Sequence, residues 1–315
     1  MKRAFITGIT GQDGSYLAEI LLEHGYEVHG MVRRSSTGNL KNLTRILPDL
    51  TLHNGDMADP ISVRSVIDRS SPDEIYHEAD QDHVGYSYDT ASYSGDITGA
   101  SVGRLLETIR TLLPFCKVFI PLSATMFGDA PAPQNMETKF SPQSPYAVNK
   151  VAAYYWARYY REQHNMAVYT ATLFNHDSDR RVGDYLLHKI CRQAVAVQQG
   201  KQENIKLSGN LFLPVDIGHA YDYMTGVYNF LQTDSPCDVI IGSGVSRRVC
   251  DLALTALNLL GVERSTIITD KKSLNDVRTL TADINHKATW KFNWDLIPVE
   301  TLIKSLLCLY GGKLA

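Results

Sequence analysis

Apolar and polar positions follow two alternating patterns through the first half of the chain. Short apolar runs typical of buried strands occur at residues 3–8, 26–34, 50–56, 74–80, 117–123 and 167–174. Between them lie stretches whose apolar residues recur at helical spacing, at 15–25, 59–70, 100–113 and 144–163. Strands that alternate with amphipathic helices form βαβ units. The pattern therefore predicts an α/β fold with a Rossmann-type, doubly wound parallel sheet.

The pattern changes after about residue 175. Helical stretches at 184–200 and 217–233 alternate there with short polar segments. We expect a larger unit over residues 1–175 and a smaller C-terminal α/β lobe over residues 176–315, with segments that can interleave. Because no long linker separates the two parts, they should fold together.

Composition narrows the class of protein. Of the 315 residues, 44% are hydrophobic and 21% charged, with a net charge of −3, as in an ordinary globular protein. The chain has no basic run that would follow a phosphate backbone, so a nucleic acid polymer is not expected as a partner. Its five cysteines never form C-x-x-C, which argues against a zinc site, and no metal is expected. No signal peptide or membrane-spanning run is expected, so we expect a cytoplasmic protein.

A glycine-rich turn joins the first predicted strand to the first helix. In "GITGQDG", Gly8, Gly11 and Gly14 allow a tight turn and let a pyrophosphate approach the helix N-terminus. Gln12 and Asp13 belong to the same turn. The strand–turn–helix context supports a dinucleotide site, which assigns residues 1–175 to cofactor binding and residues 176–315 to substrate binding.

The end of the second predicted strand indicates the kind of dinucleotide. An acidic residue there would bind the ribose 2′-hydroxyl of NAD, whereas this chain has Arg33 and Arg34. Guanidinium groups bind phosphate, so NADP is favoured over NAD. Asp56 and Met57 follow the third strand, where the adenine would lie.

Three residues form a candidate catalytic set. Tyr146 and Lys150 lie four positions apart on one helix and so share a face. An ammonium group nearby, together with the charge of an oxidised nicotinamide, lowers the pKa of a tyrosine hydroxyl and makes it a usable base. Ser123, at the end of the fifth predicted strand, can orient the substrate hydroxyl.

With these motifs the chain resembles the extended short-chain dehydrogenases/reductases that act as nucleotide-sugar epimerases and dehydratases. The opening "GITGQDGSYLAEILLEHGYEVHGMVRRSS" is similar to that of GDP-mannose 4,6-dehydratases, as are "SPYAVNK", "LFNHDSDRR" and "IGHAYDYM". The resemblance implies that hydride leaves C4 of the sugar for NADP while a tyrosine takes the hydroxyl proton. In the dehydratases, a glutamate two positions after the catalytic Ser or Thr then removes the C5 proton.

Two segments depart from this family. "SATMFG" places Thr125 at the position of the family's glutamate, and Thr does not ionise near neutral pH. The same segment is closer to that of UDP-galactose 4-epimerases. In "HEADQDHV", Glu78, Asp80 and Asp82 replace mostly uncharged residues. We expect these carboxylates to face solvent or bind local backbone, and the alternative is that Glu78 or Asp80 is a relocated acid/base.

The substrate end also differs from the family. Val215 stands where the family has an arginine on the diphosphate side, and a second family arginine is lost near the C-terminus. Arg247 or Arg278 is a candidate replacement. Asn175 and Arg180 are retained and are assigned to substrate binding. The loop that contains Arg180 lies near a subunit contact in the family, so we expect a homodimer or homotetramer.

The sequence leaves three functions open. The first is NADP-dependent oxidation at C4 of a nucleotide-linked sugar with net epimerisation. The second is 4,6-dehydration through a relocated acid/base. The third is a cofactor-binding protein without catalysis, which the intact Ser123–Tyr146–Lys150 set opposes.

Overall fold

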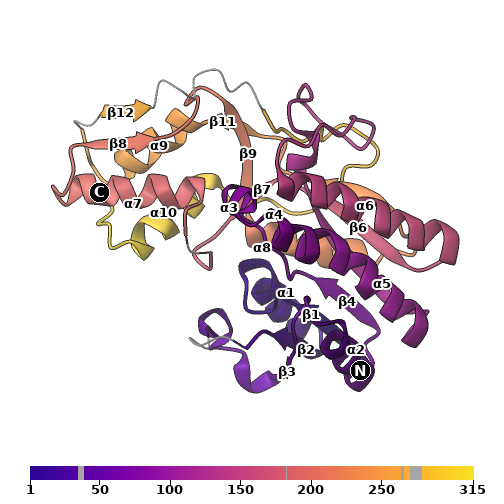
Figure 1. Ribbon diagram of the computed structural model, residues 1–315. Helices are drawn as coiled ribbons and strands as arrows, with labels where there is room; N and C mark the ends of the chain where they lie inside the picture. Colours follow the sequence, from indigo (N-terminus) through magenta and orange to yellow (C-terminus); the bar gives the residue numbers. More distant parts are fainter. Residues whose placement is uncertain (35–38, 182, 264–265, 270–278) are drawn as a thin grey trace.

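The computed structural model describes residues 1–34, 39–181, 183–263, 266–269 and 279–315. Its centre is a seven-stranded parallel sheet in the order β10-β6-β5-β4-β1-β2-β3 (Figure 1). The strands are β1 (Arg3–Thr7), β2 (Glu27–Val32), β3 (Leu50–Asn54), β4 (Glu74–His77), β5 (Lys117–Ser123), β6 (Val168–Leu173) and β10 (Asp238–Ile241). The expected Rossmann-type sheet is therefore confirmed.

Helices cover both faces of this sheet. On one face α1 packs beside α8, and on the other α5 lies between α2 and α6. These helices are α1 (Gln12–Glu23), α2 (Pro60–Ser70), α5 (Ser101–Leu112), α6 (Pro145–His164) and α8 (Ala220–Leu231). Local sequence sets where two of them begin. The Asp59 side chain accepts the Ile61 N–H before α2, and the Ser144 hydroxyl accepts the Ala147 N–H before α6.

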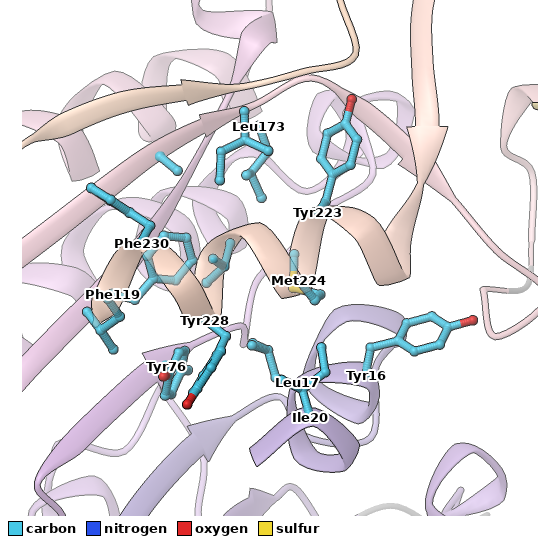
Figure 2. Packing of buried hydrophobic residues seen from close by; sticks show 14 of the residues in the cluster. Tyr16, Leu17, Ile20, Tyr76, Phe119, Leu173, Tyr223, Met224, Tyr228 and Phe230 are labelled. Atoms are coloured by element: carbon cyan, nitrogen blue, oxygen red, sulfur yellow. The ribbon is translucent and has the colours of Figure 1, made fainter. Parts of the chain in front are cut away.

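The core between α1, α8 and the sheet is rich in aromatic side chains. Figure 2 shows α8 above α1, with the side chains of both helices filling the space beside the strands. The contributing residues are Tyr16, Leu17 and Ile20 of α1, Tyr76, Phe119 and Leu173 of the sheet, and Tyr223, Met224, Tyr228 and Phe230 of α8. Full burial of such a side chain stabilises the fold by about 1.5–3 kcal/mol. This layer holds α8 against the amino-terminal half of the chain.

The C-terminal part of the chain interleaves with the large sheet. Both α8 and β10 follow residue 175, yet β10 pairs with β6 as the seventh strand. The sequence analysis missed β10 because its apolar run, Val239 to Ile241, is short. A parallel strand also needs a crossover, and α8 provides it. The division into units 1–175 and 176–315 stays a prediction, and α8 and β10 cross its boundary.

The remaining C-terminal elements form a smaller body around a core of its own. It contains a three-stranded sheet in the order β11-β9-β7 and a parallel pair, β12 and β8. The elements are β7 (Asn175–Asp177), α7 (Leu186–Gln198), β8 (Asn204–Leu207), β9 (Pro214–His219), β11 (Ser246–Arg248), α9 (Val249–Leu259), β12 (Thr266–Thr269) and α10 (Val299–Leu309). The smaller α/β lobe expected from the sequence is thus present.

Short helical segments connect the strands near the carboxyl edge of the large sheet. They are α3 (Val84–Asp89), α4 (Ala91–Ser94), a π-helical turn η3 (Gly95–Ala100) and the 3-10 turns η1 (Lys41–Leu43), η2 (Leu47–Asp49) and η4 (Ala124–Phe127). Within the described ranges, no helix combines the length and apolar character needed to cross a membrane. The outer face of α6 exposes Tyr155, Trp156 and Tyr159, and the expected homo-oligomer stays a prediction.

Candidate active site

A cleft of about 670 Å³ opens at the carboxyl ends of β1, β4, β5 and β6. The chain leaves β1 toward β2 on one side and returns to β4 on the other, so the cleft lies at the topological switch point where open α/β sheets bind ligands. Most of the residues that the sequence analysis selected line it. They are Gly8, Gly11, Gln12, Asp13, Gly14, Arg33, Asp56, Met57, Glu78, Asp80, Ser123, Thr125, Tyr146, Lys150, Asn175 and Arg180.

Two selected arginines of the described residues, Arg34 and Arg247, are not among the lining residues. Arg34 is exposed beside the cleft rather than lining it. Arg247 lies in β11, where its Nη2 atom is 3.6 Å from Glu300 Oε1. Arg278 lies outside the described residues. Arg247 is therefore engaged in the C-terminal body, and its assignment to substrate binding stays a prediction.

The turn between β1 and α1 is closely packed. Gly8 has φ +68°, and a Cβ atom there would lie 2.6 Å from the carbonyl carbon and oxygen of Glu78. A Cβ atom on Gly14 would lie 2.5 Å from Gly8 O. The Gly11 N–H donates to Gly8 O at 2.9 Å, which closes the turn. Only glycine fits at these two positions, and the bare backbone at the start of α1 fits a dinucleotide pyrophosphate.

Arg33 lies at the far end of the cleft. Its guanidinium group is exposed and donates from Nη1 to the Tyr93 hydroxyl at 2.9 Å. Asp56 and the buried Met57 line the same end of the cleft. Within the described part of the chain Tyr93 is the one hydrogen-bond partner of Arg33, and an exposed guanidinium group suits a ligand phosphate, as the expected preference for NADP requires.

The Tyr146–Lys150 pair lies on the first turns of α6, with both side chains buried. Lys150 Nζ lies 5.7 Å from the centre of the Tyr146 ring and donates to Pro121 O at 2.8 Å. It also lies 2.7 Å from Asp80 Oδ2. The structure thus brings together the lysine and tyrosine that the sequence paired, and adds a carboxylate that the sequence did not place there.

Burial raises the pKa of the Tyr146 hydroxyl above its usual value of 10. The positive charge of Lys150 and a hydrogen bond with Ser123 act in the opposite direction, whereas Asp80 and Asp82 raise the pKa further. Ser123 Oγ lies 2.9 Å from Thr125 Oγ1. Thr125 therefore contributes a hydroxyl, not a carboxylate, to the site.

The three carboxylates after β4 were expected to face solvent or to bind local backbone, and Asp80 does accept the Gln81 N–H at its Oδ1 atom. Its side chain is 12% exposed and forms the ion pair with Lys150. Asp82, which is half exposed, pairs with Arg181 at 2.7 Å. Glu78 lines the cleft, and its Oε1 atom is buried with no hydrogen-bond partner among the described residues. Burial raises the pKa of the Glu78 carboxyl well above 4.5, and the charge of Asp13 adds to this effect.

Three further contacts made by residues of the cleft could not be read from the sequence. His176 Nε2 lies 3.0 Å from Asp13 Oδ2, although the two residues are 163 positions apart. The His176 ring stacks on Tyr223, with centroids 4.8 Å apart. The Arg180 guanidinium lies 3.7 Å from the centre of the Tyr16 ring. The fold alone creates these contacts, and no local motif signals them.

The comparisons with known proteins agree with this geometry. The family model described as GDP-mannose 4,6 dehydratase matches residues 5–294. The chain is 35% identical to GDP-mannose 4,6 dehydratase 1 of Arabidopsis thaliana, over 97% of this chain and 89% of that protein. It is 38% identical to the GDP-mannose 4,6 dehydratase of Homo sapiens, over 87% of this chain and 76% of that protein.

Among solved structures, the UDP-glucose 4-epimerase of Thermotoga maritima, determined with UDP-glucose, superposes with a TM-score of 0.85. It shares 18% identity, and the match covers 98% of both chains, so it supports the fold alone. The family match spans residues 5–294 and so includes Ser123, Tyr146 and Lys150 of the cleft. The chain belongs to the GDP-mannose 4,6-dehydratase family and is an NAD(P)-dependent, nucleotide-sugar-modifying enzyme of the extended short-chain dehydrogenase/reductase type.

Proposed function

We propose that the enzyme performs a 4,6-dehydration of a nucleoside-diphosphate sugar and that Glu78 replaces the missing acid/base at Thr125. One observation carries the proposal: Glu78 places a carboxyl group in the cleft, and one of its oxygens is buried without a hydrogen-bond partner in the part of the chain that the structure describes. A carboxyl whose pKa is raised by burial can both accept and return a proton near neutral pH.

The first half of the reaction uses the Ser123–Tyr146–Lys150 set. Tyr146 removes the proton of the C4 hydroxyl, and Ser123 orients that hydroxyl through a hydrogen bond. Lys150 stabilises the phenolate of Tyr146, because its ammonium group faces the Tyr146 ring. NADP, which the turn of Gly8, Gly11 and Gly14 would hold, would supply the hydride acceptor for oxidation at C4 and the hydride donor for reduction at C6.

The second half needs a base for the C5 proton. Thr125 cannot supply it, because its hydroxyl does not ionise near neutral pH. Asp80 is occupied: one oxygen pairs with Lys150, and the other accepts from Thr98 and from the Gln81 N–H. Glu78 is left as the available carboxyl of the three acid/base candidates.

Glu78 takes the C5 proton and passes it to the departing C6 hydroxyl, which leaves as water. After hydride has reached C6, Glu78 delivers a solvent proton to C5, and the proton held by Tyr146 returns to solvent. The net change is the loss of one water, which gives a 4-keto-6-deoxy sugar without consuming the cofactor. The C4 hydroxyl proton leaves to solvent, a solvent proton replaces the C5 proton, and the hydride moves from C4 to C6.

The support for NADP and for a diphosphate substrate comes from cations at the cleft. Among the described residues Arg33 donates only to Tyr93, and it lines the cleft near the predicted adenosine end. Arg180 and Arg181 line the side formed by the loop after β7. Val215 stands where the family has an arginine, so we expect this enzyme to bind the substrate diphosphate more weakly than its relatives do.

The test is to incubate the purified enzyme with GDP-mannose and NADP in deuterated water and to follow the sugar by NMR. We expect a 4-keto-6-deoxy product with deuterium at C5. Glu78→Gln should abolish this product while still forming some reduced cofactor, because oxidation at C4 does not need Glu78. Glu27→Gln, on a half-exposed side chain at the start of β2, is the matched control and should react like the parent.

Epimerisation at C4 is the second candidate, because Ser123 and Thr125 form a pair of hydroxyls 2.9 Å apart where the relatives' glutamate would stand. An inverted C4 without deuterium at C5 would establish it and overturn the dehydration. Absence of any cofactor reduction across a panel of nucleotide sugars would instead favour binding without catalysis.

A further inference from the structure

Lys150 is fixed by contacts from three parts of the chain. Its Nζ atom lies 2.8 Å from Pro121 O on β5 and 2.7 Å from Asp80 Oδ2 in the loop after β4. Asp80 is itself held, since its Oδ1 atom accepts from the Thr98 hydroxyl at 2.5 Å and from the Gln81 N–H at 2.7 Å. The Lys150 and Asp80 side chains are 6% and 12% exposed. This buried ion pair is built into the site rather than formed on its surface.

We propose that Asp80 is a positioning residue that acts as the fixed counter-ion of Lys150, so that Lys150 assists ionisation of Tyr146 less than an unpaired lysine would. The inference rests on the proposed role of Tyr146 as the base for the C4 hydroxyl. It also removes Asp80 from the list of acid/base candidates, because both of its oxygens already have partners.

The electrostatics of the buried pair follow from its geometry. A positive charge near a phenol favours phenolate, and a carboxylate bound to that positive charge opposes the effect. The charged groups that act on Tyr146 are Lys150 on its own helix and Asp80 and Asp82 in the loop after β4, and Ser123 on β5 adds a hydrogen bond. Burial raises the pKa of Tyr146, and the two aspartates add to that rise.

Asp80 also keeps Lys150 charged. Burial alone would lower the pKa of the Lys150 ammonium, but the charge and hydrogen bond of the adjacent Asp80 carboxylate, together with the charges of Tyr146 and Glu78, more than offset this and raise it. His77, on β4, contributes no positive charge near neutral pH, because burial and the charge of Lys150 lower its pKa to about 4. Lys150 therefore stays protonated, while the negative charge of Asp80 cancels much of the electrostatic effect of Lys150 on Tyr146.

The consequence is a shift in the pH at which the enzyme works. Tyr146 must be deprotonated to accept the C4 hydroxyl proton, so kcat/KM rises with pH through the pKa of Tyr146. Removing the Asp80 charge should move this rise to lower pH. A carboxylate within about 4–6 Å of a titrating group commonly shifts its pKa by one unit or more.

The experiment compares the parent with Asp80→Asn, as full-length chains with and without NADP. The ultraviolet absorbance of tyrosinate is followed during a pH titration, and the curve of the matching Tyr146→Phe variant is subtracted to isolate Tyr146. We expect the Tyr146 midpoint to fall by about one to two pH units in Asp80→Asn, with the kcat/KM profile moving in the same direction. Asp238→Asn is the control, since Asp238 forms a similar part-buried pair with Arg161 away from the cleft.

An unchanged Tyr146 midpoint in a folded Asp80→Asn variant would overturn the proposal, and so would an equal shift in Asp238→Asn. Should Asp80→Asn not fold, Asp80→Ala, whose smaller side chain needs no partner, replaces it in the same titration. The tyrosinate readout does not require turnover. A parent that forms no product therefore rejects the proposed function and leaves the test of Asp80 intact.

Discussion

Gly8 and Glu78 meet backbone to backbone where β1 and β4 end, so that a Cβ atom on Gly8 would lie 2.6 Å from the Glu78 carbonyl carbon. This contact joins the turn that would hold the cofactor pyrophosphate to the segment that carries the candidate acid/base. The position of the Glu78 carboxyl in the cleft therefore depends on the absence of a side chain at residue 8. The turn predicted to bind the cofactor and the residue proposed to transfer protons therefore lie next to each other at one edge of the sheet.

Gly8→Ala should damage this corner. The new methyl group would collide with backbone atoms, and Gly8 has φ +68°, which alanine adopts at a cost. We expect the free energy of unfolding to fall by about 2–3 kcal/mol and dinucleotide affinity to fall at least about tenfold. Chemical denaturation and calorimetric titration with NADP measure the two effects.

Gly25→Ala is the matched control, because Gly25 has φ +76° but nothing within 4 Å of its added Cβ. Gly25→Ala should lower the free energy of unfolding only by the backbone strain, about 1 kcal/mol, and should leave the cofactor affinity unchanged. Equal losses of stability and affinity in the two variants would show that the contact with Glu78 is unimportant.

Arg33→Ala should weaken NADP but not NAD. Arg33 lines the cleft and is held by Tyr93, whereas the neighbouring Arg34 is exposed and does not line it. Loss of a charge-assisted hydrogen bond to the 2′-phosphate should weaken NADP binding by about tenfold to a hundredfold. Fluorescence titration with each dinucleotide measures this selectivity. A larger effect of Arg34→Ala than of Arg33→Ala would contradict the assignment.

The Asp13–His176 pair should make stability depend on pH in two directions. Burial opposes the charge on His176, but the Asp13 carboxylate raises the pKa of His176 above 6.5. Burial would likewise raise the pKa of Asp13, yet the charge of His176 lowers it below 3.8. The histidine contribution is therefore complete below pH 6.5 and is lost as the pH rises through the raised pKa. The aspartate contribution is complete above pH 3.8 and is lost as the pH falls through the lowered pKa.

His176→Gln should remove the loss of stability that the parent shows as the pH rises above 6.5. It should also lower the maximum free energy of unfolding by about 1–3 kcal/mol. Urea denaturation at a series of pH values measures both. His164→Gln, at an exposed position at the end of α6, should keep the parent's pH profile. A parallel displacement of the His176→Gln curve at every pH would mean that the histidine acts through packing on Tyr223 rather than through charge.

The parts of the site that were predictable from sequence are those set by local spacing. Gly8, Gly11 and Gly14 lie within one turn, and Tyr146 and Lys150 lie one helical turn apart, so short-range geometry fixes their roles. The alternating strands and helices of the first half were predictable for the same reason, because each element follows from the residues of one short stretch.

The remaining features depend on contacts between distant segments. The ion pair of Lys150 with Asp80 and the pair of His176 with Asp13 form only when the loop after β4, α1, α6 and β7 reach the same edge of the sheet. A sequence shows that such charges exist but not which opposite charge each will meet. The pairing of Asp80 with Lys150 was not predicted for this reason.

Thr125→Glu, combined with Glu78→Gln, tests whether the acid/base has moved within one cleft. Both positions line that cleft, and Thr125 Oγ1 lies 2.9 Å from Ser123 Oγ. A glutamate at 125 restores the family's carboxylate beside the catalytic serine. We expect the double variant to regain incorporation of deuterium at C5 that Glu78→Gln alone has lost, at least about tenfold above that single variant, because one positioned base supplies about a hundredfold or more. Thr125→Gln in the same background adds similar bulk without a base and should regain nothing. Recovery in both double variants would mean that shape rather than proton transfer limits the reaction, and Glu78 would then not be the base.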